Sequence, residues 1–568
     1  MKKETRFSRE VLIYCLIFLL ALAVRLAQLG RIPLLNSEAA WAFQAWQISR
    51  GASIPLGSQV GYLSITEALF TLFGGSDFLA RLWPALIGSL VIWVPYLLRK
   101  RLDQSPAVVL AIGLAIDPSL ASVSRIAASP MPSLVFLLLA AAAFDTGKKR
   151  WLAVFFGLGM LSGPGFWLGF ALLILTAIIC SLVGFFDLRP YIKTRLAFLQ
   201  GGKDSIPALL DAFLIPLMVL VMVGSFFFSN FQGLSAWAGS VPEVISALFQ
   251  PGGIHPARLL INLAVSNPLI LGLGISGFIA SWRFDHQVGK VSLIWFLVSL
   301  LVLLIIPARQ AADLIWLAFP LWITSSRELI RIYRLAKDSW VVYSLAGLVG
   351  VLIVLNWLTF TGMVFQIGNS RAVLLQWGLI AASTALIILT MTIAASELGW
   401  SISLKGLGLG FSAMLVIYMV SSLVQGIHLR QGDPRSIWSD GTGAGQIALL
   451  QESIYDASIS QTGRGDSIQG VVVGSWDSVR WALRDVENIE FQDSLDPESL
   501  PPLIITSSAD YYRVNEELYR GQDFILETRP GWAGIIPPDW ISWIAFRSGV
   551  LESEEIILWI RNDIYSGY

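Results

Sequence analysis

The feature that most constrains this chain is a series of thirteen apolar runs, most of them long enough to cross a membrane as helices. A helix needs about 20 predominantly apolar residues to span the hydrocarbon core. Hydrophobic residues make up 55% of the 568 residues and charged residues only 14%, whereas soluble domains carry about 25% charge. The sequence therefore excludes a disordered or wholly soluble chain and predicts a polytopic α-helical membrane protein with about thirteen spans. The runs are 11–29, 83–98, 106–122, 131–144, 151–163, 166–185, 207–228, 259–281, 291–306, 312–326, 340–362, 373–395 and 405–426.

Basic residues alternate between the two sides predicted by these runs. The N-terminus and every second connecting segment together hold 21 Lys and Arg, whereas the intervening segments hold seven. Cytoplasmic segments of membrane proteins carry such an excess. The first run, 11–29, has no small-residue cleavage site and is interpreted as a retained span. The pattern predicts a multi-pass protein of the cell membrane with a cytoplasmic N-terminus and a C-terminus on the other side.

The C-terminal part has a different character. Residues 429–568 hold 22 of the 39 acidic residues and 10 of the 39 basic ones, so this part is strongly acidic. Short apolar strand patterns alternate here with helical patterns, which favours a small α/β layer structure. The strand patterns are 468–474, 489–491, 503–507 and 523–527, and the helical ones 446–455, 476–484 and 511–519.

These observations predict three parts: a transmembrane domain over 1–427, a linker region over 428–466 and an extracytoplasmic α/β domain over 467–568. No glycine-rich phosphate loop follows a strand, so nucleotide binding has no support and nucleic acid is not an expected partner. No His, Asp or Glu cluster has metal-ligand spacing. We therefore expect no metal site and no firmly bound cofactor, apart from a divalent cation that could accompany a lipid phosphate.

The long outer segment between the first two spans, about 30–81, holds the first candidate site residue. Residues 37–50 fit a helix lying on the membrane surface, with Trp41 on its apolar stripe and Asn36 or Ser37 able to cap its start. Glu38 falls in the first turn. It could act as a general base where a lipid headgroup meets an acceptor hydroxyl. Alternatively, it complements the helix dipole.

Four stretches in this order resemble a known family. They are SEAAWAFQAWQISRG at 37–51, LFGGSDFLARLWPALIGSLVIWVPYLLRKRL at 72–102, LAIDPSLASVSRIAASPMPSLVFLLLAAAAF at 114–144 and FFGLGMLSGPGFWLGFALLIL at 155–175. Their succession is similar to the GT-C superfamily of membrane glycosyltransferases, which includes PMT/ArnT-like and RgtA/B/C/D-like branches. The resemblance covers roughly residues 10–330. It implies a polyprenyl-phosphate sugar donor, a membrane lipid environment and an acceptor that is a glycan, a lipid or a protein.

Three charges that the resemblance implies are absent. The family begins its outer helix with Asp-Glu, and that Asp is the presumed base, whereas this chain has Ser37 and Glu38. A lysine expected near the fifth and sixth spans is Gly163, and a polar position of the third stretch is Ser129. Either Glu38 has taken the base role, shifted by one residue, or this branch has lost transfer activity.

The resemblance also implies phosphate contacts on the outer side. Arg125 and Arg309 would hold the lipid phosphate, since a guanidinium binds phosphate oxygens bidentately. The alternatives are an interfacial arginine for Arg125 and a salt bridge to Asp313 for Arg309. The remaining candidates are Ser37 and Trp41 for substrate contact, and Glu67 and Asp77 for the missing acid.

A further stretch in the C-terminal part, GSWDSVRWALRDVENIEF at 474–491, resembles Agl23-like proteins, GT-C relatives with outward soluble domains. Trp481, Arg484 and Asp485 match that pattern. These residues either contact an acceptor glycan or belong to a helix packed on its sheet, with an Arg–Asp pair.

Three functions remain open on the sequence. The first is a membrane glycosyltransferase that transfers a sugar from a polyprenyl-phosphate donor to an acceptor hydroxyl at the outer leaflet, inverting the anomeric configuration. The second is a catalytically degenerate relative that binds lipid-linked glycan or assists envelope glycan assembly. The third is an unrelated transporter, which the scarcity of charges inside the spans disfavours.

Overall fold

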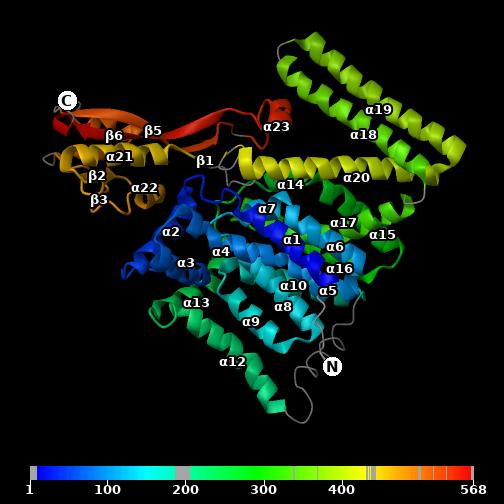
Figure 1. Ribbon diagram of the computed structural model, residues 1–568, viewed down its shortest axis with the longest axis horizontal. Coiled ribbons are helices and arrows are strands. Elements are labelled where there is room, and N and C mark those ends of the chain that lie inside the picture. The colour runs from blue at the N-terminus through cyan, green and yellow to red at the C-terminus, as the bar shows by residue number, and fades with distance from the viewer. Residues whose placement is uncertain are drawn as a thin grey trace.

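The computed structural model describes residues 9–185, 205–336, 339–366, 369–429, 433, 435, 443–496, 500–515, 517–532 and 534–564. These residues form a helical body and, at one side of it, a small domain built on a β-sheet (Figure 1). A mostly helical body of apolar helices with a C-terminal sheet domain agrees with the fold class expected from the sequence. The basic residues of the predicted inner segment 186–204 lie outside the described residues.

A helix or a series of helices occupies each of the thirteen apolar runs, because long apolar stretches bounded by Gly, Pro or charged residues satisfy their backbone groups internally. These elements are α1 (Arg9–Leu26), α4 (Asp77–Ser89) with η1 (Leu90–Ile92) and α5 (Trp93–Leu102), α6 (Gln104–Ile116) with α7 (Pro118–Val123), α8 (Met131–Thr146), α9 (Lys149–Met160), α10 (Pro164–Leu182), α12 (Ser205–Gly224), α14 (Pro256–Ser266) with α15 (Pro268–Arg283), α16 (Gln287–Ile305), η2 (Ala311–Leu314) with α17 (Ile315–Ala336), α18 (Trp340–Gly362), α19 (Ser370–Leu398) and α20 (Trp400–Val424).

In the described part of the chain, fewer helices than the thirteen expected spans are long and apolar enough to cross a membrane. Within the described ranges, six helices or helix series are long and apolar enough to cross a membrane, and α14 with α15 adds a seventh if this pair, bent by 94°, is one span. The expected thirteen crossings are therefore not confirmed. Helices such as α8 and α9, with 16 and 12 residues, fall short of the length that a straight crossing needs.

Two glycines pack against tryptophan rings in the core of the helical body. Gly113 of α6 lies against the ring of Trp322 in α17, and Gly169 of α10 lies against Trp316. Trp322 also donates its indole N–H to the Asp117 carboxylate at 2.7 Å, between α6 and α7. Small residues allow such close helix approach in membrane proteins, so the bundle is fixed at these points.

The outer segment folds into two helices ahead of α4. α2 (Asn36–Ser49) lies where a helix is expected at 37–50, and α3 (Val60–Phe73) follows it. The residue at the α2 cap is Leu35, and no side chain caps the helix there. Instead of the expected cap by Asn36 or Ser37, the Glu38 carboxylate accepts the Leu35 backbone amide at 3.1 Å.

The C-terminal domain is a six-stranded mixed sheet with the order β1-β5-β6-β4-β2-β3. β2 pairs in parallel with β3 and β4, and the other neighbours are antiparallel. α21 (Ile447–Thr462), which falls in the range expected to be a linker, packs its apolar side into the core of this domain. The strands are β1 (Gly443–Ala444), β2 (Gln469–Val473), β3 (Asn488–Gln492), β4 (Leu503–Ser507), β5 (Tyr519–Pro530) and β6 (Leu551–Arg561).

The prediction of a helix at 511–519 in this domain is wrong. A short 3-10 turn, η5 (Ser508–Arg513), stands there, and strand β5 begins at Tyr519. β5 pairs along its length with β6, from Tyr519 opposite Arg561 to Pro530 opposite Leu551. Pairing with a strand distant in sequence overrides local preference, and the local pattern does not indicate β6.

Two helices of the sheet domain pack on the helical body. α22 (Asp477–Ala482) packs on α2, and α23 (Trp540–Phe546) packs on α18. Arg547, directly after α23, donates to the Tyr418 hydroxyl of α20 at 3.0 Å. The start of α2 and the hairpin of α18 and α19 therefore both border the side of the molecule where the sheet lies (Figure 1).

Candidate functional site

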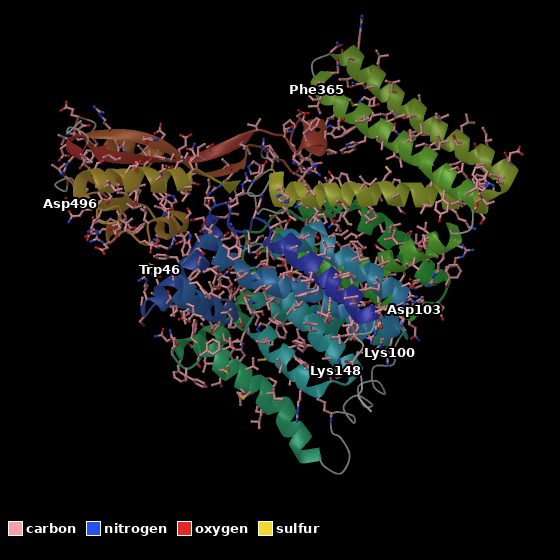
Figure 2. All side chains as sticks on the ribbon, in the orientation of Figure 1. Trp46, Lys100, Asp103, Lys148, Phe365 and Asp496 are labelled. Atoms are coloured by element: carbon pink, nitrogen blue, oxygen red, sulfur yellow. The ribbon has the colours of Figure 1, made fainter. Side chains whose placement is uncertain are left out.

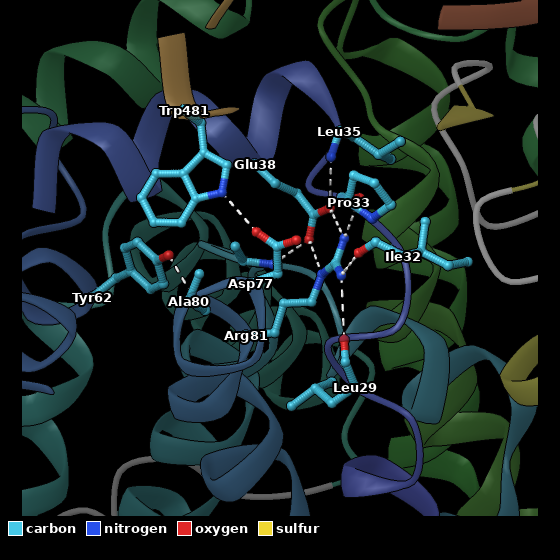
Figure 3. A network of polar contacts seen from close by, with 11 residues as sticks. Leu29, Ile32, Pro33, Leu35, Glu38, Tyr62, Asp77, Ala80, Arg81 and Trp481 are labelled. Carbon is cyan, nitrogen blue, oxygen red and sulfur yellow. Dashed lines mark hydrogen bonds and ion pairs between the residues drawn. The ribbon is translucent and has the colours of Figure 1, made fainter. Parts of the chain in front are cut away.

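At the start of α2, hydrogen-bond donors surround the Glu38 carboxylate (Figure 3). Its Oε1 accepts Arg81 Nε at 2.9 Å and the Ala127 backbone amide at 2.8 Å. Its Oε2 accepts Arg81 Nη2 at 2.5 Å and the Leu35 amide at 3.1 Å. The side chain is only 2% exposed. Glu38 thereby joins α2 to α4 and to the turn after α7.

Arg81 completes the same network from α4. Its Nη1 donates to the carbonyls of Leu29 at 3.2 Å and Ile32 at 2.7 Å, and Nη2 donates to Pro33 at 3.2 Å. All three guanidinium nitrogens are engaged in this buried site. Removing one partner of a buried, bidentate pair leaves the other charge uncompensated and costs about 3–5 kcal/mol. The pair therefore fixes the outer segment against the helical body.

This geometry bears on proton transfer at Glu38. A general base needs a lone pair directed at the proton that it removes. Each Glu38 oxygen already accepts two hydrogen bonds from groups of the fold. Glu38 can serve as a base only if Arg81 or a backbone amide first moves away.

The two alternative acids lie in different surroundings. Asp77 lies beside the Glu38–Arg81 pair and accepts the indole N–H of Trp481 at 2.6 Å (Figure 3). The Trp481 ring also stacks on Phe70 with centroids 5.6 Å apart. Glu67 of α3 accepts the Thr71 hydroxyl at 3.1 Å. Burial raises the pKa of Glu67 above its ordinary value, and the Thr71 hydrogen bond partly offsets this.

Two predicted substrate contacts lie on α2. Ser37 is exposed in the first turn. Trp41 is half-buried against Gly57, where a Cβ at residue 57 would clash with the indole ring. Gln44 Oε1 accepts the Gly57 amide at 3.1 Å, which holds the loop before α3 against this face. The Trp41 ring is thus covered by the protein's own chain.

Both arginines expected to hold phosphate are bound to helix ends. Nη1 of Arg125 donates to Val24 at 3.2 Å, Arg25 at 3.0 Å and Ala27 at 2.7 Å, carbonyls near the end of α1. Arg309 donates to Leu303 at 2.8 Å and Ile254 at 2.7 Å. Cations stabilise helix C-termini because they pair with the terminal carbonyls. A phosphate contact at either residue requires exchange with these carbonyls.

A small cavity lies beside the outer segment, between α3, α4 and the turn after α9. Its volume is about 20 Å³, which is room for about one water molecule. Tyr62, Ser129 and Ser162 supply polar lining, and no carboxylate lines it. This cavity is therefore too small for a sugar.

A metal centre is not formed by the side chains that the structure describes. Among them, no group of three or more His, Cys, Asp or Glu could hold a metal ion. The buried acid of the outer segment is balanced by a guanidinium instead.

The sequence analysis missed the partner of Glu38. Arg81 counts there only as one of the seven basic residues of the outer segments, although a lone charge in an apolar run signals a buried partner. It also missed Glu527 of β5, which is 6% exposed. The Asn36 backbone amide, at the start of α2, is near enough to the Glu527 carboxyl to lower its pKa. No local pattern indicates this contact, because it joins residues on opposite ends of the chain.

The fold and the site define a protein of apolar helices whose outer segment is built around a buried carboxylate–guanidinium pair. A family model described as dolichyl-phosphate-mannose-protein mannosyltransferase matches residues 61–203. This match confirms, over that part of the chain, the resemblance to GT-C membrane glycosyltransferases.

Two solved structures are similar to the chain as a whole. Both are crystal structures of ArnT from Cupriavidus metallidurans, each 14% identical in sequence. The one bound to undecaprenyl phosphate has a TM-score of 0.46 and covers 98% of both chains. The apo structure has a TM-score of 0.49 and covers 98% of this chain and 99% of its own. No curated protein matches the sequence.

Proposed function

We propose that the protein binds a polyprenyl-phosphate-linked glycan at the outer leaflet of the cell membrane and assists glycan assembly there, without transferring the sugar itself. The observation that carries this proposal is the state of Glu38, whose two oxygens are filled by Arg81 and by two backbone amides. The neighbouring position has a hydroxyl, Ser37, in place of an acid. The carboxylate at the start of α2 is thus occupied by hydrogen bonds within the fold, whereas a transferase needs a carboxylate that is free to accept a proton.

The class of ligand rests on the family match. Its description names a lipid-phosphate-linked mannose, and the matched residues 61–203 include α3, α4 and Arg125. In our proposal Arg125 and Arg309 contact the lipid phosphate, each exchanging a carbonyl for a phosphate oxygen, which is the stronger, charge-assisted acceptor. Exposed Ser37 then faces the sugar, Trp41 reaches it once the loop at Gly57 moves off its ring, and α22 of the C-terminal domain covers the sugar from the other side.

Sugar transfer is the second candidate, and the family match favours it. In this reaction an acceptor hydroxyl gives its proton to a carboxylate and attacks the anomeric carbon. The bond from that carbon to the phosphate oxygen breaks on the opposite face, so the configuration inverts and the lipid phosphate leaves. Glu38 would be the base after release from Arg81. Glu67, whose pKa is raised by burial, and Asp77 are the alternatives.

One assay with two readouts separates these functions. Purified full-length protein is mixed with polyprenyl-phosphate sugars, and both bound donor and freed lipid phosphate are measured. We expect retained donor without freed lipid phosphate. A variant with Arg125→Gln should bind the donor more weakly, whereas Arg31→Gln, an exposed arginine near the outer segment, should not. Absence of donor binding would overturn the proposal, and freed lipid phosphate would favour transfer.

A further inference from the structure

A second pocket lies at one end of the helical body, and Asp103, which is labelled together with Lys100 in Figure 2, is one of its lining residues. Its volume is about 370 Å³. The start of α6, the second half of α15, the residues that connect α15 to α16, and the second half of α17 line it. This is the end that the basic residues assign to the cytoplasm. The charged and titratable side chains of its lining are Asp103, His286, Arg327, Glu328, Arg331 and Arg334.

Two nitrogens of this pocket are donors without a partner. Nη2 of Arg327 lies within hydrogen-bond distance of Nε2 of His286. A guanidinium can only donate, so Nε2 accepts and the ring proton resides on Nδ1. Burial and the Arg327 charge lower the pKa of His286, which keeps this ring neutral. Nδ1 of His286 and Nη1 of Arg327 are buried and have no partner of hydrogen-bond geometry among the described residues; the backbone group that acts on the His286 ring belongs to His286 itself.

Two such donors in one pocket indicate a missing acceptor. A buried donor left without a partner destabilises a fold, and native proteins keep few of them. The residues nearest to Arg327 do not meet this need: Asp103 is largely exposed and lies 3.6 Å from Nη2. Glu328 is buried and directs both oxygens to Arg331. The pocket therefore has unused donors and no unused buried acid in its described lining.

The charge of the lining decides the kind of acceptor. Three arginines face two acids, and His286 is neutral, so the lining is positive by one charge. An anion with several acceptor oxygens fits such a pocket better than a neutral ligand, because arginine forms charge-assisted hydrogen bonds with oxyanions. Phe284 and Leu335, exposed apolar side chains of the same lining, border the pocket.

We propose that this pocket binds a phosphate group through Arg327 and His286, whose buried N–H groups, unpartnered within the described chain, turn toward it on binding, with Arg331 and Arg334 attracting it. The phosphate has two possible sources, the headgroup of an anionic phospholipid or a soluble phosphate. Basic pockets between helices on the cytoplasmic side of membrane proteins bind phospholipid headgroups. The apolar border at Phe284 gives an acyl chain a place to lie. This site is separate from the outer segment and does not depend on the function proposed there.

The test titrates purified full-length protein in detergent in two arms. One arm adds phosphatidylglycerol and counts bound lipid by native mass spectrometry, and the other adds inorganic phosphate and follows binding by calorimetry. Arg327→Gln removes the central cation, and His286→Gln keeps an acceptor near Nε2 but removes the Nδ1 donor. Arg283→Gln is the matched control, because Arg283 is exposed at the same end of the body and does not line the pocket.

We expect wild-type binding in one arm, weakened at least about tenfold by Arg327→Gln and several-fold by His286→Gln, with Arg283→Gln within about twofold of wild type. Binding in the lipid arm alone identifies a headgroup site, and binding of inorganic phosphate identifies a soluble ligand. The proposal is overturned if neither ligand binds. It is also overturned if His286→Gln and Arg327→Gln both bind like wild type, or if Arg283→Gln loses as much as Arg327→Gln.

Discussion

Two buried side chains, Glu38 and Arg81, hold the outer segment in place through hydrogen bonds to each other and to the backbone. Glu38 and Arg81 are 2% and 4% exposed, and the hydrogen bonds around them replace the water that both lose on folding. The loss of solvent and the gain of partners nearly cancel when both are present. The pair therefore matters most through what happens when one member is removed.

We predict that Arg81→Met lowers the free energy of unfolding by about 3–5 kcal/mol, because Glu38 stays buried without its cation. Thermal unfolding of the detergent-solubilised protein, followed by tryptophan fluorescence, measures this. The double variant Glu38→Gln with Arg81→Met should lose less than the sum of the two single losses, since the residues are in contact. Arg464→Gln, which breaks an exposed pair with Asp466, should cost no more than about 1 kcal/mol. Equal losses for Arg81 and Arg464 would contradict the structural role.

At the level of elements, the helices meet through small residues, and the sheet domain docks through two short helices, α22 and α23. Gly113 permits α6 to lie against Trp322 of α17. Trp481 connects α22 to Asp77 at the start of α4, and Ser478 donates its amide to the Asn36 side chain at 3.0 Å. Both contacts join helices whose positions follow from sequence periodicity. The periodicity does not predict which helices contact each other.

A methyl group at residue 113 should overpack the contact between α6 and α17. We expect Gly113→Ala to destabilise the protein by about 1–3 kcal/mol. The control is Gly272→Ala in α15, where an added Cβ meets nothing within 4 Å, and no comparable loss is expected there. Thermal unfolding of both variants decides. A harmless Gly113→Ala would show that the two helices are not packed as described.

Docking of the C-terminal domain should weaken when the Trp481 indole N–H is removed. Trp481→Phe keeps an aromatic ring on Phe70 but leaves Asp77 without that donor, at a cost of about 1 kcal/mol. Hydrogen exchange of the α22 amides should become faster. Trp540→Phe makes the same chemical change on α23, where the ring is 41% exposed, and should leave α22 unchanged. Unaltered α22 exchange in Trp481→Phe would remove this contact from the account.

For the molecule as a whole, the sequence predicts what is local and misses what is distant. Apolar length and the positions of Gly and Pro locate the helices, and β4 is found at 503–507 as expected. The Glu38–Arg81 pair joins residues 43 positions apart, and β5 pairs with β6 across a loop. Such pairings depend on which faces meet in three dimensions. The sequence therefore predicts where the candidate site lies in the chain. It does not predict that the Glu38 carboxylate is buried and paired with Arg81.

Stability of the assembled molecule should also depend on pH through Glu527. Burial raises the pKa of this carboxyl; Glu554 acts in the same direction, and Arg529 and the Asn36 amide oppose it. Because the folded state disfavours the charged form, this contribution is present below the unfolded pKa and is lost as pH rises through the folded pKa.

The comparison of wild type with Glu527→Gln isolates this contribution. At neutral pH the variant should be the more stable of the two, and the difference should shrink as the pH falls through the raised pKa of Glu527. Thermal unfolding over a pH series measures the difference, and Asp523→Asn, on the exposed side of β5, serves as the control. A difference that does not change with pH would be evidence against the buried acid.

The claim at the centre of this account is that the first-turn carboxylate of α2 is a structural anchor. The most direct measurement is the rate at which purified wild-type protein and Glu38→Gln free lipid phosphate from a panel of polyprenyl-phosphate sugars in the presence of acceptors. We predict that neither protein frees lipid phosphate faster than a sample without protein, although the wild-type protein binds the donor. Turnover by wild type that Glu38→Gln abolishes, in a variant that remains folded, would contradict it.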